Sequence, residues 1–133
     1  MKTARSAGRT RRGGPATETF RDGTPSAKGR YVAGRKSGRW TYYFRDGSVR
    51  ARGPYADGEL DGLWTWYRKG GGLLQRGRFK DGKRHGTWER YRANGQLYDV
   101  GTYSLGRKMG VWLKYDARGK LVGSPRPRGV GRG

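Results

Sequence analysis

The stretch GRYVAGRKSGRWTYYFRDGSVRAR, residues 29–52, is followed by three further copies of the same pattern that begin at Gly53, Gly77 and Gly101. The interval is 24 residues each time, so the register of the pattern never slips. Self-similarity at a fixed period indicates a repeat array, in which each unit packs mainly on its neighbours.

Seven other positions return in the same phase and carry glycine, aromatic or aliphatic residues. They are Tyr31, Tyr55, Phe79 and Tyr103; Gly34, Gly58, Gly82 and Gly106; Gly38, Gly62, Gly86 and Gly110; Trp40, Trp64, Trp88 and Trp112; Tyr43, Tyr67, Tyr91 and Tyr115; Gly47, Gly71, Gly95 and Gly119; and Val49, Leu73, Leu97 and Leu121. Each unit therefore has two short strand-like runs, in the first unit around residues 30–33 and 39–44, between glycine-bounded turns. The Asp57-Gly58 and Asp81-Gly82 dipeptides tolerate the positive φ that tight reversals need.

This pattern predicts an all-β fold, an elongated and twisted single-layer antiparallel meander of four tandem β-hairpin repeats with about eight strands. A glycine inside a strand needs a covering side chain, and an aromatic ring is the expected cover. Two registers fit the first unit: Gly29 pairs with Tyr43, or Tyr31 faces Trp40. The tryptophan and tyrosine columns lie three residues apart, so they are expected on opposite faces of the sheet.

The pattern also divides the chain into segments. Residues 29–122 hold the four repeats, and residues 15–28 form a degenerate half repeat or cap, because 20–24 match 44–48 while Ala16 stands in the tryptophan position. Residues 1–14 and 123–133 are basic, rich in glycine and nearly free of apolar residues, so we expect them to be disordered. No apolar stretch follows the basic residues of 1–14, which argues against a secretory signal and predicts a cytoplasmic protein.

The chain is strongly basic, with 31 lysines and arginines against 10 acidic residues and a formal net charge of +21. Residues 29–121 carry +13 of this charge, so the repeats hold more of it than the ends do. The excess reflects either a compositional bias toward arginine and glycine or a selected electrostatic surface.

The sequence lacks the residues that catalysis or a cofactor would need. It contains no cysteine, which excludes disulfides, thiolate metal ligands and cysteine nucleophiles. Its one histidine, His85, lies in a turn, and the turn carboxylates Asp46, Asp57, Asp81 and Asp116 are placed to bond local backbone amides. We therefore predict a protein that is not an enzyme and that has no catalytic residue, metal site or cofactor.

Two surfaces are candidates for binding a partner. The first turns of the units carry Arg35, Lys36, Lys83, Arg84, Arg107 and Lys108, and hairpin tips two strands apart are spaced by roughly 10 Å. This row of cations either contacts phosphates and lipid head groups or only keeps the array soluble.

The second candidate surface lies beside the tryptophan column, at positions that differ between units. The position two residues after each tryptophan reads Tyr42, Trp66, Arg90 and Lys114, and the next same-face position includes Arg68 and Arg92. Aromatic and arginine side chains together suit stacking and cation-π contacts, although in the first two units core packing competes with this role.

The run Gly-x-Tyr-x-x-Gly-x-x-x-Gly-x-Trp-x-x-Tyr-x-x-x-Gly, read from Gly29 and again from 53, 77 and 101, resembles the longer bacterial variant of the MORN repeat. This resemblance implies protein or membrane contact, since bacterial proteins of similar architecture are often labelled antitoxin-like and other members are linked to acidic phospholipids and scaffolding. Phe79 replaces the tyrosine in the third unit, and the second unit has a longer glycine run at 70–72.

The leading hypothesis is a non-catalytic scaffold for protein–protein interaction, in an antitoxin-like role. The alternative is electrostatic binding of nucleic acid or an acidic membrane surface, driven by the +21 charge. Self-association through the open ends of the sheet is a further expectation.

Overall fold

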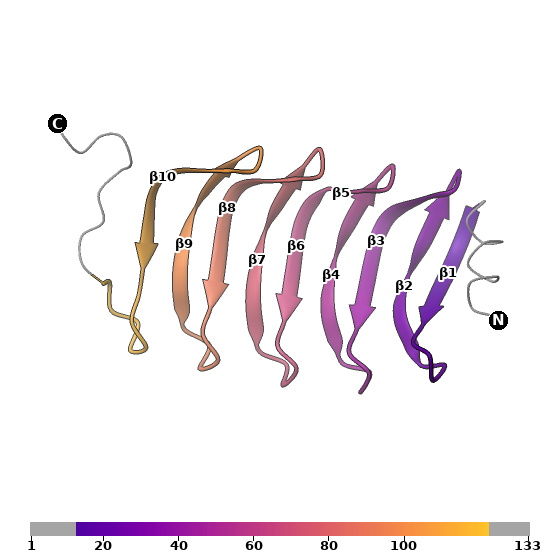
Figure 1. Cartoon of the computed structure of the whole chain (residues 1–133), viewed down its shortest axis with the longest axis horizontal. Helices are drawn as coiled ribbons and strands as arrows, with labels where there is room; N and C mark the ends of the chain where they lie inside the picture. Colours follow the sequence, from indigo (N-terminus) through magenta and orange to yellow (C-terminus); the bar gives the residue numbers. More distant parts are fainter. Residues whose placement is uncertain (1–12, 123–133) are drawn as a thin grey trace.

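The computed structural model describes residues 13–122, and the strands of this part form one open antiparallel sheet (Figure 1). The strands are β1 (Gly13–Thr19), β2 (Pro25–Val32), β3 (Arg35–Tyr43), β4 (Val49–Ala56), β5 (Glu59–Leu60), β6 (Gly62–Tyr67), β7 (Leu73–Lys80), β8 (Lys83–Tyr91), β9 (Leu97–Ser104) and β10 (Arg107–Lys114). They follow one another across the sheet in chain order, except that β5 pairs only with β4. The predicted single-layer meander of hairpins is confirmed. No helix in residues 13–122 is long and apolar enough to cross a membrane.

The strand boundaries differ from the sequence prediction in two details. In the second unit β5 lies in the segment predicted to be a turn, and β6 starts after Asp61, whose backbone N–H donates to the Pro54 carbonyl at 3.0 Å. β1 pairs with β2 and begins at Gly13 and Gly14, which we had assigned to the N-terminal tail. The remainder of the two tails predicted to be disordered, residues 1–12 and 123–133, lies outside the described residues.

The first turn of each unit is a tight two-residue reversal. In the first unit Val32 pairs with Arg35, so Ala33 and Gly34 alone form the turn, with φ of 51° and 81°. Positive φ at both central residues defines the type I′ turn, whose twist matches that of paired strands. The same geometry recurs at Asp57-Gly58, Asp81-Gly82 and Leu105-Gly106.

Neither of the two registers that fit the sequence is the one adopted. Between the pairs Lys28↔Thr41 and Arg30↔Ser37, β3 carries two more residues than β2, and so forms a bulge opposite Gly29. A glycine with positive φ lies in this bulge in every unit: Gly38, Gly62, Gly86 and Gly110. Both predicted registers were wrong because they assumed a longer turn with regular pairing after it.

The bulge brings each tryptophan ring over the first glycine of its own unit. A Cβ added at Gly29 would overlap the indole of Trp40, and the same overlap occurs for the pairs Gly53 and Trp64, Gly77 and Trp88, and Gly101 and Trp112. The indole N–H of Trp40 donates to the Arg30 carbonyl at 3.1 Å. The expected aromatic cover of the strand glycines is therefore supplied by tryptophan.

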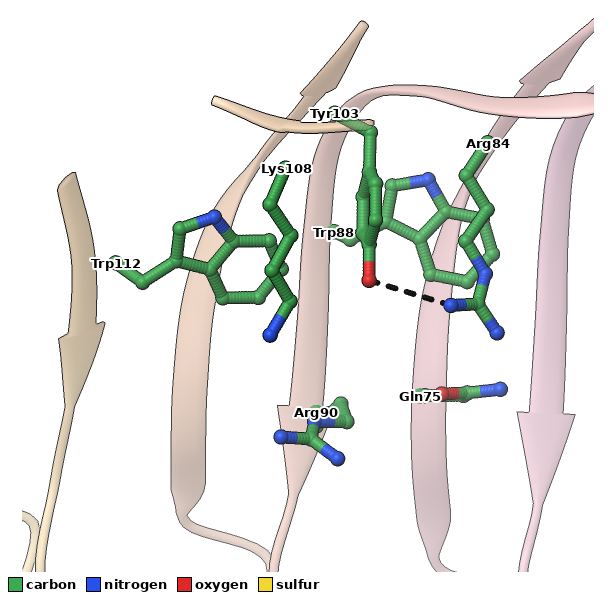
Figure 2. Close-up of a pocket in the computed structure, with 7 residues that line it drawn as sticks. All are labelled: Gln75, Arg84, Trp88, Arg90, Tyr103, Lys108 and Trp112. Atoms are coloured by element: carbon green, nitrogen blue, oxygen red, sulfur yellow. Dashed lines mark hydrogen bonds between the residues drawn. The ribbon is translucent and has the colours of Figure 1, made fainter. Parts of the chain in front are cut away.

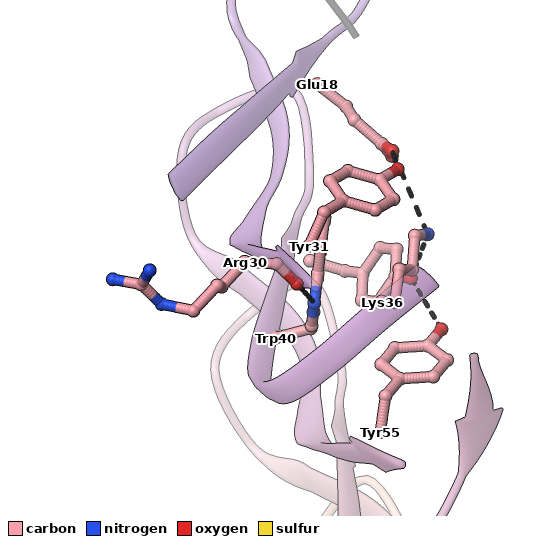
Figure 3. A network of polar contacts seen from close by, with 7 residues as sticks. Glu18, Arg30, Tyr31, Lys36, Trp40 and Tyr55 are labelled. Atoms are coloured by element: carbon pink, nitrogen blue, oxygen red, sulfur yellow. Dashed lines mark hydrogen bonds and ion pairs between the residues drawn. The ribbon is translucent and has the colours of Figure 1, made fainter. Parts of the chain in front are cut away.

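The tryptophans join the neighbouring tyrosines in a continuous row of rings on one face. Trp40 makes edge contacts with Tyr31 of β2 and Tyr55 of β4, at centroid distances of 5.4 and 6.2 Å, as Figure 3 shows. Trp40 is fully buried and Trp64 is 2% exposed, although the sheet has one layer. Burial is achieved because side chains of adjacent strands cover one another on this face.

The second aromatic column lies on the opposite face, as predicted. Lys28 lies over the ring of Tyr43 at 5.9 Å, and Arg52 lies over Tyr67 at 5.6 Å. Lys28 and Arg52 each follow a buried alanine, so alternation along the strand directs them away from the tryptophan face.

Replacing Gly77 with alanine tests the ring-over-glycine contact. The added methyl group would overlap the Trp88 ring, so we expect Gly77→Ala to lower the free energy of unfolding by about 1–3 kcal/mol in urea titrations. Gly70→Ala is the matched control, since nothing lies within 4 Å of its added Cβ, and it should change stability by less than about 1 kcal/mol. Equal losses in the two variants would show that the ring contact does not limit this position.

Candidate binding surface

The face of the sheet that carries the tryptophans, the tryptophan face, changes along the array from apolar to polar and charged residues. The position that follows each tryptophan by two residues holds Tyr42, Trp66, Arg90 and Lys114, and its cross-strand column holds Ala27, Ala51, Gln75 and Asp99. In the first two units these residues are apolar and belong to the hydrophobic core or pack against it. In the third and fourth units they are polar or charged, which makes this part of the face a candidate binding surface.

A small cavity of about 110 Å³ opens on this part of the face (Figure 2). It is lined by Gln75, Arg84, Trp88, Arg90, Tyr103, Lys108 and Trp112. A wider hollow of about 450 Å³ shares Gln75 and Arg90 with it and extends toward the other end of the strands, where Arg92 and Tyr98 line it. The two depressions share Gln75 and Arg90, and we call them together the groove.

Cations rest on the faces of the tryptophan rings. The guanidinium of Arg84 lies 5.0 Å from the Trp88 centroid and donates to the Tyr103 hydroxyl at 3.2 Å. The ammonium of Lys108 lies 4.6 Å from the Trp112 centroid, as in Figure 2. Such contacts attract through the ring quadrupole and leave the charge of the cation uncompensated.

One acidic side chain lies within this group of cations. Asp99 is 4% exposed and accepts two hydrogen bonds from Arg90, at 2.9 and 2.6 Å. These bonds raise the pKa of Arg90 above its ordinary value, since they favour the charged guanidinium. The pair holds the Arg90 side chain in one orientation in the groove.

Three further contacts between cations and an aromatic ring involve Tyr98. The Tyr98 ring lies 5.1, 4.9 and 5.5 Å from the charged groups of Arg90, Arg92 and Lys114. Among the described residues, the Arg90–Asp99 pair is the one ion pair on this part of the sheet face. We call the surface formed by Arg84, Arg90, Arg92, Lys108, Lys114, Trp88, Tyr98, Tyr103 and Trp112 the basic aromatic face.

The model of a known repeat family, described as "MORN repeat variant", matches residues 36–57 and 84–104. Each match begins in one 24-residue unit and ends in the next. The chain therefore carries MORN repeats at these two places. The matched segments begin near the first turn and end in the following unit, so the family pattern and the hairpin pattern coincide.

Two further comparisons add little about this MORN repeat protein. A solved structure described as "Crystal structure of GtfA/B complex bound to UDP and GlcNAc" is similar at 16% sequence identity and a TM-score of 0.35. The similarity covers 84% of this chain and 22% of that one, so the chain spans less than a quarter of the other protein's length. At this identity and TM-score the likeness carries no conclusion about function. No curated protein matches the chain.

The six cations predicted at the hairpin tips of the MORN repeats fall into two groups. Lys36, like Arg84 and Lys108, is directed onto the tryptophan face, and its ammonium lies 4.6 Å from the Trp40 centroid. Arg35 and Lys83 instead lie against the turn glycine of the next hairpin, and Arg107 occupies the corresponding position in the last hairpin. The tips therefore contribute cations to two different surfaces.

The predicted residues beside the tryptophans also fall into two groups. Tyr42 and Trp66 pack against the hydrophobic core, whereas Arg90 and Lys114 belong to the basic aromatic face. Arg68 donates to the Tyr91 carbonyl at 2.8 Å. Arg92 donates to the Tyr115 carbonyl at 3.0 Å, so each of these two arginines also connects the end of one hairpin to the end of the next.

The sequence prediction of the site missed the first strands of the units. Gln75, Tyr98, Asp99 and Tyr103 contribute to the groove, but none was among the candidates. The sequence did contain a signal for these residues. The equivalent positions Ala27, Ala51, Gln75 and Asp99 change from small to polar at the third unit, and the positions two residues after the tryptophans become charged at the same unit.

His85 and Asp46, two of the turn residues named in the sequence analysis, have structural partners. The Nδ1 atom of His85 accepts a hydrogen bond from the Leu105 backbone N–H at 3.1 Å, which ties two hairpin tips together. Asp46 accepts hydrogen bonds from the Ser48 hydroxyl and backbone N–H, and these bonds lower its pKa. In residues 13–122 no group of three or more acidic or histidine side chains is arranged to hold a metal ion.

Replacing Arg90 with glutamine tests the strength of its pair with Asp99. The variant leaves a buried carboxylate without its counter-charge, so we expect a loss of about 1–3 kcal/mol in the free energy of unfolding. Arg76→Gln is the control, because the Arg76–Glu89 pair is more exposed and should contribute less than about 1 kcal/mol. Adding Asp99→Asn to Arg90→Gln should recover most of the loss; failure to recover would show that packing, and not charge, dominates.

Proposed function

We propose that this MORN repeat protein is a non-catalytic scaffold that binds an acidic surface of a protein partner through its basic aromatic face. The observation that carries the proposal is the group of cations on the third and fourth units, held on aromatic rings beside a single ion-paired carboxylate. MORN repeats generally mediate binding and are a non-enzymatic repeat type, which agrees with this assignment.

The composition of the face favours a protein partner. Arginine, tryptophan and tyrosine are the residues most enriched at the energetic centres of protein interfaces, and all three line the cavity. Rings fixed by neighbouring strands lose little conformational entropy on binding, and an acidic partner would supply the missing counter-charges. An antitoxin-like role, in which the partner is a toxin, is one specific form of this function.

Binding to a polyanion is the second candidate, and the distribution of charge over both faces favours it. The face opposite the tryptophans carries its own exposed cations, among them Lys28, Arg30, Arg52, Arg76 and Arg78. A nucleic acid or an anionic membrane would engage both faces without a specific pocket.

Paired charge variants distinguish these functions. The double variant Arg84→Gln/Lys108→Gln removes two charges from the basic aromatic face, and Arg30→Gln/Arg78→Gln removes two from the opposite face. We expect the first variant to lose capture of the native partner by more than about tenfold and the second to retain it, as quantified by pull-down at about 50 and 200 mM salt.

The two salt concentrations decide between partner classes. Capture through the packed face should weaken only moderately between them, because salt screens its charges but not its ring contacts, whereas polyanion binding should weaken by orders of magnitude over that range. Equal losses in the two double variants, together with a steep salt dependence, would refute a protein-binding face and support the polyanion.

A further inference from the structure

The row of rings on the tryptophan face stops abruptly at β10. Inside the array, Trp40 lies between the rings of Tyr31 and Tyr55, and Trp88 lies between those of Phe79 and Tyr103. Within residues 13–122, Trp112 contacts the ring of Tyr103 alone. The place that a following strand would fill with an aromatic residue is therefore open.

The cation above Trp112 has the same incomplete set of partners. In the first unit Lys36 contacts the Trp40 ring and also the ring of Tyr55 on the next strand, at 5.4 Å. In the third unit Arg84 lies 5.4 Å from Tyr103 of the next strand. Lys108 is their equivalent, and its one ring partner in the described part of the chain is Trp112.

A third interaction is incomplete at the same edge. Arg90 on β8 binds Asp99, which the next strand places directly opposite. Lys114 is the equivalent residue on β10, and it forms no ion pair within residues 13–122, because Asp99 on its inner side is bound to Arg90. An acidic residue on a following strand would meet Lys114 as Asp99 meets Arg90.

Within residues 13–122, the outer side of the β10 backbone is also unpaired for most of its length. Among the described residues, only Leu121 and Val122 reach its outer side, through the bridge Tyr115↔Leu121 and a hydrogen bond from the Val122 N–H to the Lys114 carbonyl at 2.7 Å. The 24-residue period places Pro125 and Pro127 where the fourth unit has Gly101 and Tyr103. Proline has no backbone N–H to donate to β10. This segment of sequence is also basic, so it lacks the acidic residue that would pair with Lys114.

We propose that the outer edge of β10 binds one extended, acidic segment of a partner protein as an additional antiparallel strand. The internal repeats define its pattern: an Asp or Glu opposite Lys114, followed four residues later by Tyr or Phe opposite Gly110, as Asp99 and Tyr103 stand opposite Arg90 and Gly86. Main-chain hydrogen bonds supply affinity in such strand addition, and the alternate side chains supply specificity.

A second copy of this chain fits the edge poorly. Two β10 edges would bring together like charges at Arg107, Lys108 and Lys114. The other open edge, β1, has the sequence GGPATET, with a proline in the ladder and no aromatic residue. Charge complementarity therefore selects an acidic partner.

A peptide with the sequence of β9 provides the probe. Labelled LYDVGTYS, the sequence of residues 97–104, should bind the full chain in fluorescence anisotropy titrations. Replacing its aspartate with lysine should weaken binding about five- to tenfold, and replacing its second tyrosine with serine should weaken it similarly. The backbone nitrogens of the peptide form two alternating sets, of which only one faces β10. Methylating that set should abolish binding, and methylating the other set should not.

A charge exchange tests the register. Lys114→Glu should weaken binding of the original peptide and restore binding of the lysine peptide, and this coupling requires direct contact between the two positions. The proposal goes beyond the proposed function but shares Lys108 and Trp112 with the basic aromatic face. Arg84→Gln should therefore leave peptide binding unchanged while weakening partner capture, so each proposal can fail alone. No binding at 1 mM peptide, no restoration by the charge exchange, or tolerance of both methylation sets would overturn the strand-addition site.

Discussion

The contact between a tryptophan ring and a bare glycine on the adjacent strand is the interaction on which the rest of this structure depends. A single-layer sheet has no second layer to exclude water, so its apolar side chains must cover one another. The indole of Trp64 does so by lying on Gly53 and donating to the Pro54 carbonyl at 2.7 Å. This contact requires a glycine beneath the ring and a bulge that directs the ring inward, and both recur in every unit.

The same contact explains why only certain positions vary. Glycine and tryptophan are fixed by the shape of their contact, and the type I′ turn fixes the residues with positive φ. The position two residues after the tryptophan has no such constraint. It fills the core as Tyr42 and Trp66 and carries charge as Arg90 and Lys114, so one scaffold provides a packed half and a charged half.

The positive charge of the chain also acquires a structural role from this arrangement. Arg84 and Lys108 cover indole rings that would otherwise face water, and their aliphatic stems bury part of the ring surface. Their charges remain available because rings, and not carboxylates, are their partners. The basic aromatic face is therefore the cover of the tryptophan row and also the surface that we propose for binding a partner.

The sequence by itself determined the period of 24, the hairpin in each unit, the single sheet and the placement of the two aromatic columns on opposite faces. These features follow from spacing along the chain, which a repeat displays directly. The tertiary structure alone decided the register, the direction of Arg84 and Lys108 onto the rings, and the pairing of Arg90 with Asp99. The reason is the bulge at the third glycine of each unit: two added residues shift which side chains meet across the strands, and spacing along one strand does not specify its partner on the next.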